Sequence, residues 1–309
     1  MSLAACMARD SWIIGNGGAA KLSRLSESLF RKIQEADANR TGTFSPYYLP
    51  WLTCPVRADK VGVRSIIPSE DRILRDEFVL RRLRKAYWAS RDAPLGEVSI
   101  TSKCMSIDVR AEKRNLEALT SAIDLVVTTN DSWKVRFQSL AQFIIPLKTL
   151  GKGVRAGGVG FSSEFAKGAI FLSIPKIAKF SEVELSINLA HEMGHQSLMI
   201  FQSGDRIIDG DLGAPVFSGV RKTNRPAIQS FHAMIALAFM VEYSLSRLDD
   251  PAPLSSDGQG YLRKRADELI QDLAIAVTGF SKVCMTRIGQ ILYDECRDLL
   301  AKAESESAL

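Results

Sequence analysis

"SEVELSINLAHEMGHQSLMIFQSG", residues 181–204, is the stretch that decides how the chain is interpreted. Ser181 followed three residues later by Glu184 has the spacing of a capping box, which starts helices. Gly204 is a residue type that commonly ends them. The stretch therefore predicts one helix. Within it, residues 189–196 read "LAHEMGHQ", with a histidine, a glutamate, two spacers and a second histidine.

The two histidines of this octet are placed to share a metal ion. His191 and His195 are four residues apart, so a helix presents them on one face. Glu192 lies about 100° around the axis from His191. It is therefore poorly placed as a ligand, but it can reach a metal-bound water or a bound substrate. The alternative is a pair of structural histidines without a metal. Gly194 costs up to about 1 kcal/mol of helix propensity, and its small size lets another element approach closely.

A catalytic metal needs a third protein ligand and open positions for substrate or water. His232 is the only other histidine in the chain, and it lies in an apolar segment that predicts a buried helix beginning near residue 226. We expect His232 to be the third ligand. Glu242, further along the same helix, is the alternative that a zinc peptidase would use. Asp209 or Asp211 would instead give the two-histidine, one-carboxylate triad of non-haem iron enzymes.

Arg225 precedes His232 by seven residues, which is about two helical turns. If the helix already includes both residues, their side chains lie on one face. A guanidinium beside a metal suits a ligand that carries a carboxylate, because the two groups form a bidentate pair. The alternative is a solvent-exposed arginine at the start of a helix.

The remaining sequence predicts a mainly α fold, a single multi-helix domain over residues 1–309. Its metal-binding core is expected within 165–245, where "GAIFLSIP" (168–175) indicates a short β element before the motif helix. Residues 205–224 are expected to form a loop that lines the pocket. Other helices are expected over 21–40, 68–92, 111–126 and 131–149, with one or two more after 255. The proline-rich stretch 41–56 and the glycine-rich stretch 151–165 are expected to be irregular.

Composition narrows the function classes. The net charge is +5, and the basic residues are dispersed, so a nucleic-acid partner is not expected. Five widely spaced cysteines indicate neither a disulfide framework nor a cysteine zinc site, and favour a reducing cytoplasm. No apolar run of 18 residues predicts a membrane span, and no signal peptide is expected. The sequence leaves the oligomeric state open.

Two segments together resemble a known family. "SINLAHEMGHQSL", followed about 30 residues later by "RPAIQSFHAMIALAF", is similar to the HExxH-motif family of peptide-modification proteins, which accompany ribosomal peptide (RiPP) biosynthesis. The resemblance covers about 165–245. Members of that family are described as iron- and 2-oxoglutarate-dependent peptide β-hydroxylases.

The resemblance implies specific roles. His191, His195 and His232 would bind Fe(II), and Arg225 is then our candidate for the distal carboxylate of 2-oxoglutarate. Glu192 matches the motif glutamate, and it would orient a ligand or the substrate amide. The implied protein is a dioxygenase, an oxidoreductase acting on a precursor peptide.

Two other functions stay open from the residues alone. A zinc metallopeptidase would use Glu192 as general base on a zinc-bound water, with Glu242 or His232 as the third ligand. A non-enzymatic helper would bind a peptide in a biosynthetic complex. Imidazole suits both iron and zinc, so the motif does not choose the metal. It also does not identify the substrate peptide or the modified residue.

Overall fold

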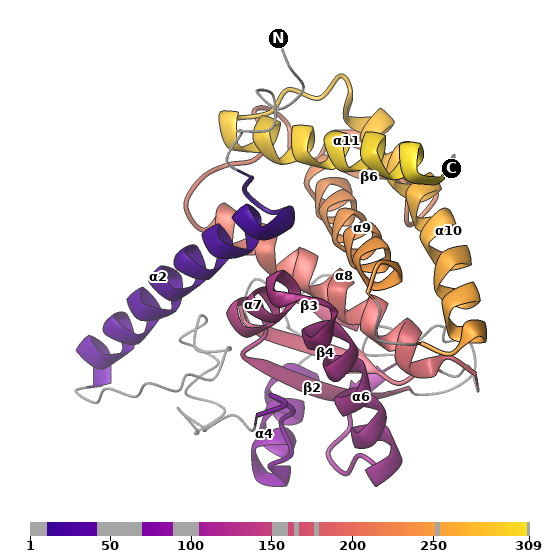
Figure 1. The fold of residues 1–309 in the computed structure, drawn as a ribbon. Helices are drawn as coiled ribbons and strands as arrows, with labels where there is room; N and C mark the ends of the chain where they lie inside the picture. The colour runs from indigo at the N-terminus through magenta and orange to yellow at the C-terminus, as the bar shows by residue number, and fades with distance from the viewer. Residues whose placement is uncertain are drawn as a thin grey trace.

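A computed structural model describes residues 11–41, 70–88, 105–149, 160–163, 167–175, 179–250 and 254–307. The described chain is mainly α-helical and has two small sheets (Figure 1). The helices are α2 (Gly15–Thr41), α4 (Glu77–Trp88), α6 (Lys113–Thr129), α7 (Asp131–Leu140), α8 (Ser181–Gln202), α9 (Ala227–Leu248), α10 (Ser256–Phe280) and α11 (Arg287–Ser307). The predicted mainly α fold class, with a short β element before the motif helix, is confirmed.

The larger sheet has the strand order β1-β2-β4-β3. Its strands are β1 (Met105–Ile107), β2 (Phe143–Thr149), β3 (Gly160–Ser162) and β4 (Ala169–Ser173). β2 and β4 are parallel, with Ile144 opposite Ile170, whereas β1 and β3 are antiparallel to their neighbours. All five residues of β4 are buried, as expected for a strand covered on both faces. Helix α8 packs against β3 and β4, so the sheet supports the motif helix.

Helices α8 and α9 form the centre of the molecule (Figure 1). They run antiparallel, because His232 near the start of α9 contacts Gln202 at the end of α8, while Met240, about two turns later along α9, contacts His191, about three turns earlier along α8. Gly194 allows the two backbones to approach closely. A Cβ atom built there would lie 2.8 Å from Cα of Ala236. This confirms the close approach that the glycine predicted.

Helix α9 is long and apolar enough to cross a membrane by composition, but 72% of its most apolar window is buried inside the protein. Its buried residues include Phe231, Phe239 and Tyr243, which pack in one continuous core with α8, α10 and α11. The helix is therefore a core element, as its apolar sequence predicted.

Three predicted helix limits were wrong. Residues 131–149 form α7 and then strand β2, because Pro146 cannot donate a helical N–H and the run before it is apolar and β-branched. Helix α4 begins at Glu77 and not at residue 68. Ile73, within the predicted helix, instead forms an isolated parallel β-bridge with Ile144 of strand β2. Helix α2 begins at Gly15, six residues before its predicted start.

The predicted capping box at the start of α8 was also wrong. Phe180 occupies the N-cap position in a left-handed conformation, with φ of 66°, and no side chain caps the helix. The carboxylate of Glu184 instead accepts hydrogen bonds from Tyr261 and Arg265 of α10. The helix is thus fixed by tertiary contacts. Thr41, the first residue of the predicted irregular stretch 41–56, is the last residue of α2, and the rest of that stretch lies outside the described residues. Most of 151–165 also lies outside them, and Gly160–Ser162 forms strand β3.

Candidate metal centre

His191 and His195 lie at the separation of two ligands of one metal ion. Their Nε2 atoms are 3.1 Å apart, and their ring centroids are 4.7 Å apart at an interplanar angle of 85°. Two nitrogens at this separation, each about 2.1 Å from an ion, subtend an angle of about 95°. That angle lies within the range of octahedral and tetrahedral sites. The helical spacing therefore brings together the first two predicted ligands.

His232 lies beside this pair but slightly further away. Its ring centroid is 5.6 Å from that of His195. Rings that share one ion have centroids roughly 4.5 to 5.2 Å apart, given metal–nitrogen bonds of about 2.1 Å. Within the described ranges, no set of three or more His, Cys, Asp or Glu side chains has metal-holding geometry. The donor set thus fits a metal through two nitrogens, and the third ring must approach by roughly half an ångström.

Two of the imidazoles also make a polar contact with a side chain that is not a histidine. Nδ1 of His191 lies 3.1 Å from Sδ of Met240, and Nε2 of His232 lies 2.8 Å from Oε1 of Gln202. Sequence reasoning missed both partners. Gln202 follows His195 by seven residues and Met240 follows His232 by eight, so same-face spacing along the two helices was the available signal.

The three imidazoles are neutral near pH 7. Burial lowers the pKa of His191 to about 4, and the nearby charge of Arg221 contributes in the same direction. Burial also lowers the pKa of His232 to about 4. The pKa of His195 is lowered by burial and by the charges of its neighbours, which are the other two histidines and the arginines at 225 and 221. Neutral imidazole is the form that binds metals.

The arginines near this centre belong to a hairpin, β5 (Pro215–Ser218) and β6 (Thr223–Pro226). The prediction that residues 205–224 form only a loop was therefore wrong. Arg225 lies in β6 and not in the helix, because the residue before a proline disfavours the helical region. Its partner in the register is buried Val216, so both side chains are on the hairpin face that turns to the protein body.

Arg225 nevertheless comes close enough to the centre for its charge to lower the pKa of His195. Arg221, in the turn between β5 and β6, acts on both His191 and His195. Sequence reasoning missed Arg221, although it lies in the segment "SGVRKTNRP" just before the predicted arginine. Two guanidinium groups beside neutral imidazoles favour a ligand that carries negative charge.

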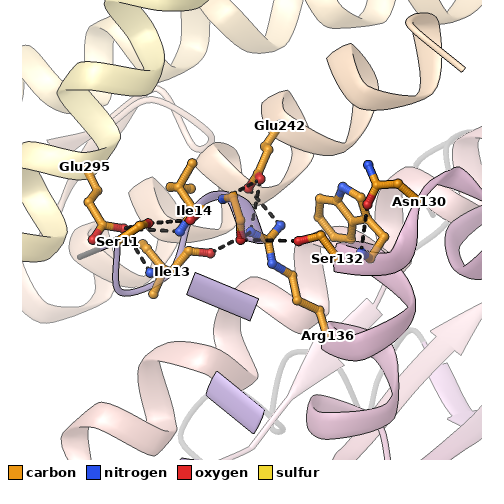
Figure 2. A network of polar contacts seen from close by, with 10 residues as sticks. Ser11, Ile13, Ile14, Asn130, Ser132, Arg136, Glu242 and Glu295 are labelled. Atoms are coloured by element: carbon orange, nitrogen blue, oxygen red, sulfur yellow. Dashed lines mark hydrogen bonds and ion pairs between the residues drawn. The ribbon is translucent and has the colours of Figure 1, made fainter. Parts of the chain in front are cut away.

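Glu242, the alternative third ligand, is engaged in other contacts in this structure. Its carboxylate forms a bidentate ion pair with Arg136 of α7, with distances of 2.8 Å from Nη1 to Oε2 and 3.0 Å from Nη2 to Oε1 (Figure 2). It also accepts a hydrogen bond of 2.8 Å from the backbone N–H of Gly15. This carboxylate holds helices together, and periodicity gave no signal of that role.

Neither alternative aspartate is placed with the imidazoles. Asp209 and Asp211 are exposed, and the carboxylate of Asp211 accepts a hydrogen bond from the backbone N–H of Gly213 in its own loop. Among the described residues, the charged groups that shift the pKa of His195 are histidines and arginines. A carboxylate in contact would raise that pKa. His232 is thus the third side chain that the structure brings to the pair.

Glu192 is buried, with 2% of its surface exposed, and faces strand β3. A Cβ atom built at Gly160 would lie 2.6 Å from Oε1 of Glu192, so the strand passes directly over the carboxylate. Oγ of Ser162 also donates to the backbone oxygen of Glu192 at 3.4 Å. The motif glutamate therefore lies between the axis of the motif helix and a strand at the edge of the described sheet.

The arrangement combines two imidazoles at ligand spacing, a third ring beside them, two nearby cations and one buried carboxylate. Comparison with known proteins does not assign this chain to a family. No protein-family model matches the chain, and no curated protein matches it either.

Proposed function

We propose that this protein is a cytoplasmic Fe(II)/2-oxoglutarate-dependent oxygenase that hydroxylates the β-carbon of a side chain on a ribosomally made peptide. The observation that carries the proposal is the gathering of His191, His195 and His232, from two separate helices, with Arg221 and Arg225 near enough for their charges to act on His195. Three neutral nitrogens leave open positions on an octahedral ion. The adjacent cations suit a dicarboxylate co-substrate.

Each group has a role under this proposal. The three histidines hold the iron, and Arg225, together with Arg221, binds the distal carboxylate of 2-oxoglutarate. The bound iron supplies oxidation of a C–H bond by O2, coupled to conversion of 2-oxoglutarate to succinate and CO2. Glu192, which is buried beneath strand β3, would orient a ligand or the substrate amide, the role that the resemblance leaves for it.

A zinc metallopeptidase is the second candidate. The presence of Glu192 directly after His191 on the motif helix favours it, because this is where the zinc peptidase pattern has its general base. Glu192 would then be the general base on a zinc-bound water, with His232 as the third ligand.

The decisive experiment incubates the anaerobically purified protein with Fe(II), 2-oxoglutarate, O2 and candidate precursor peptides, and follows the products by mass spectrometry. We expect the peptide to gain one oxygen, with one succinate released per hydroxylation. Omission of 2-oxoglutarate and the variant His191→Ala are the controls, and both should abolish the gain. Cleavage of the peptide with zinc and without co-substrate would support the peptidase and overturn the oxygenase.

The arginines allow a second test of the co-substrate. Arg225→Gln should raise the KM for 2-oxoglutarate at least about tenfold, since a charge-assisted pair contributes about 1.5–3 kcal/mol. The same substitution should leave the affinity for the metal unchanged. Arg206→Gln, on an exposed part of the preceding loop, is the matched control. An unchanged KM in Arg225→Gln and in Arg221→Gln would contradict the assigned carboxylate site.

The cytoplasmic location is part of the same proposal. The cysteines that the structure describes, Cys284 and Cys296, are both free thiols. Cys296 is fully buried, and burial raises the pKa of its thiol. Unpaired cysteines agree with a reducing compartment, where a precursor peptide is synthesised.

A further inference from the structure

Gln202 is the last residue of α8, two helical turns beyond His195. Its amide oxygen lies 2.8 Å from Nε2 of His232, which belongs to the facing helix. The ring of His232 therefore lies between the end of α8 and His195, whose ring centroid is 5.6 Å away. A polar contact in this place links the third imidazole to the helix that carries the other two.

The nature of each partner atom determines where the ring protons are. An amide oxygen can only accept a hydrogen bond, so Nε2 of His232 carries the proton and Nδ1 carries the lone pair. A thioether sulfur also only accepts. Because Sδ of Met240 lies 3.1 Å from Nδ1 of His191, that nitrogen carries the proton and Nε2 carries the lone pair. This Nε2 is the atom that faces His195 at 3.1 Å.

We propose that Gln202 and Met240 are positioning residues of the metal centre, which fix the tautomers of His232 and His191. The ion would then be bound through Nδ1 of His232 and Nε2 of His191. Histidine ligands commonly donate their second ring N–H to an acceptor that sets their tautomer and orientation. The metal-binding half of this inference rests on the proposed function, whereas the tautomers are a property of the metal-free protein.

The tautomers can be measured directly because the chain has only three histidines. Nitrogen-15 NMR of the metal-free protein at pH 8, assigned with single His→Asn variants, should show His232 protonated on Nε2 and His191 protonated on Nδ1. In Gln202→Ala the signals of His232 should shift toward a mixture of both tautomers. Met240→Leu, which keeps the volume and removes the acceptor, should do the same for His191. A wild-type His232 protonated on Nδ1 would overturn the proposal.

Metal affinity tests the second half, with Co(II) or Zn(II) as the probe in competition with a chromophoric chelator. Gln202→Ala should weaken binding about 10- to 100-fold, the usual effect of removing such a partner. Gln202→Glu, which keeps the acceptor, should restore it. Gln290→Ala is the matched control, since Gln290 is exposed on α11 and its side chain bonds only to Asp294 among the contacts described.

The outcomes separate this inference from the proposed function. Tighter binding by Gln202→Ala would mean that the amide withholds His232 from the metal, and would overturn the positioning role. A wild-type protein that binds no metal but shows the expected tautomers would overturn the metal centre and leave the two hydrogen bonds in place. If Gln202→Ala fails to fold, the wild-type spectrum alone still decides the tautomer of His232.

Discussion

At the scale of single residues, the three histidines are imidazoles kept neutral by burial. Their lowered pKa values mean that, between about pH 4 and 6.5, the unfolded chain binds protons at these positions and the folded chain does not. The free energy of unfolding is therefore highest above pH 6.5, as far as these groups determine it. It decreases as the pH falls through this window. Sequence spacing predicted the pair at 191 and 195, since a helix fixes it. It could not predict burial, which depends on α9.

We therefore expect the metal-free protein to lose stability between pH 6.5 and 4.5 more steeply than a variant without these groups. The comparison is His191→Gln/His195→Gln/His232→Gln, and the slope should differ by at most about 1.4 kcal/mol per pH unit for each histidine. Urea unfolding at four pH values measures it. Equal slopes in the two proteins would show that the imidazoles titrate as they do in water.

Other single residues show where sequence reasoning stopped. Arg225 was predicted at the site because of its charge, and its charge does act on His195, but the helical spacing used to place it was wrong. Glu242 shares a helix with His232, which made it a candidate. Its partner Arg136 is 106 residues away in the chain. Contacts at such separations leave no periodic signal.

At the scale of elements, the site depends on how closely α8 and α9 approach. A Cβ at Gly194 would lie 2.8 Å from Cα of Ala236 and 3.2 Å from the carbonyl oxygen of Ile235, both of them backbone atoms. Gly194→Ala should therefore separate the helices and destabilise the fold by about 1–3 kcal/mol, despite the better helix propensity of alanine. It should also weaken metal binding, because His232 moves with α9.

Gly260 provides the matched control for this substitution. It lies within α10, and a Cβ there would meet no atom of the described chain within 4 Å. Gly260→Ala should be neutral or stabilise the protein by up to about 1 kcal/mol. Thermal unfolding of both variants checks the pair. If the two variants unfold at the same temperature, the fold does not depend on the close approach of α8 and α9 at Gly194.

Most elements were predictable, and the exceptions share a physical cause. The helices at 113–129 and 181–202 and the strand at 169–173 follow from periodic or continuous apolar patterns. Strand β2 was missed because a short apolar run looks the same in a buried helix and a buried strand. The hairpin of β5 and β6 was missed because its strands, PVFS and TNRP, are only four residues long and show no clear alternation of apolar and polar residues.

At the scale of the whole molecule, the N-terminal segment ties distant helices together (Figure 2). Backbone N–H groups of Trp12, Ile13 and Ile14 donate to the carboxylate of Glu295 on α11. The next residue, Gly15, donates to Glu242 on α9. Two carboxylates from the C-terminal half thus fix the entry to α2. The composition of residues 11–15 gave no sign of this, because the contacts use backbone groups.

The ion pair of Arg136 and Glu242 lies at the centre of this network, and it separates a structural role from a metal-binding one. Arg136 is fully buried and also donates to the backbone oxygens of Ile13 and Gly15, at 2.9 and 3.1 Å. Removing one partner leaves a buried charge, so Arg136→Met and Glu242→Leu should each cost about 3–5 kcal/mol. The double variant should cost clearly less than their sum, because no uncompensated charge remains. Urea unfolding of the four proteins gives the coupling energy, and additive costs would contradict the pair. The metal affinity of Glu242→Gln, measured well below its melting temperature, should equal that of the wild type. A large loss of metal affinity in this variant would show that Glu242 is a metal ligand.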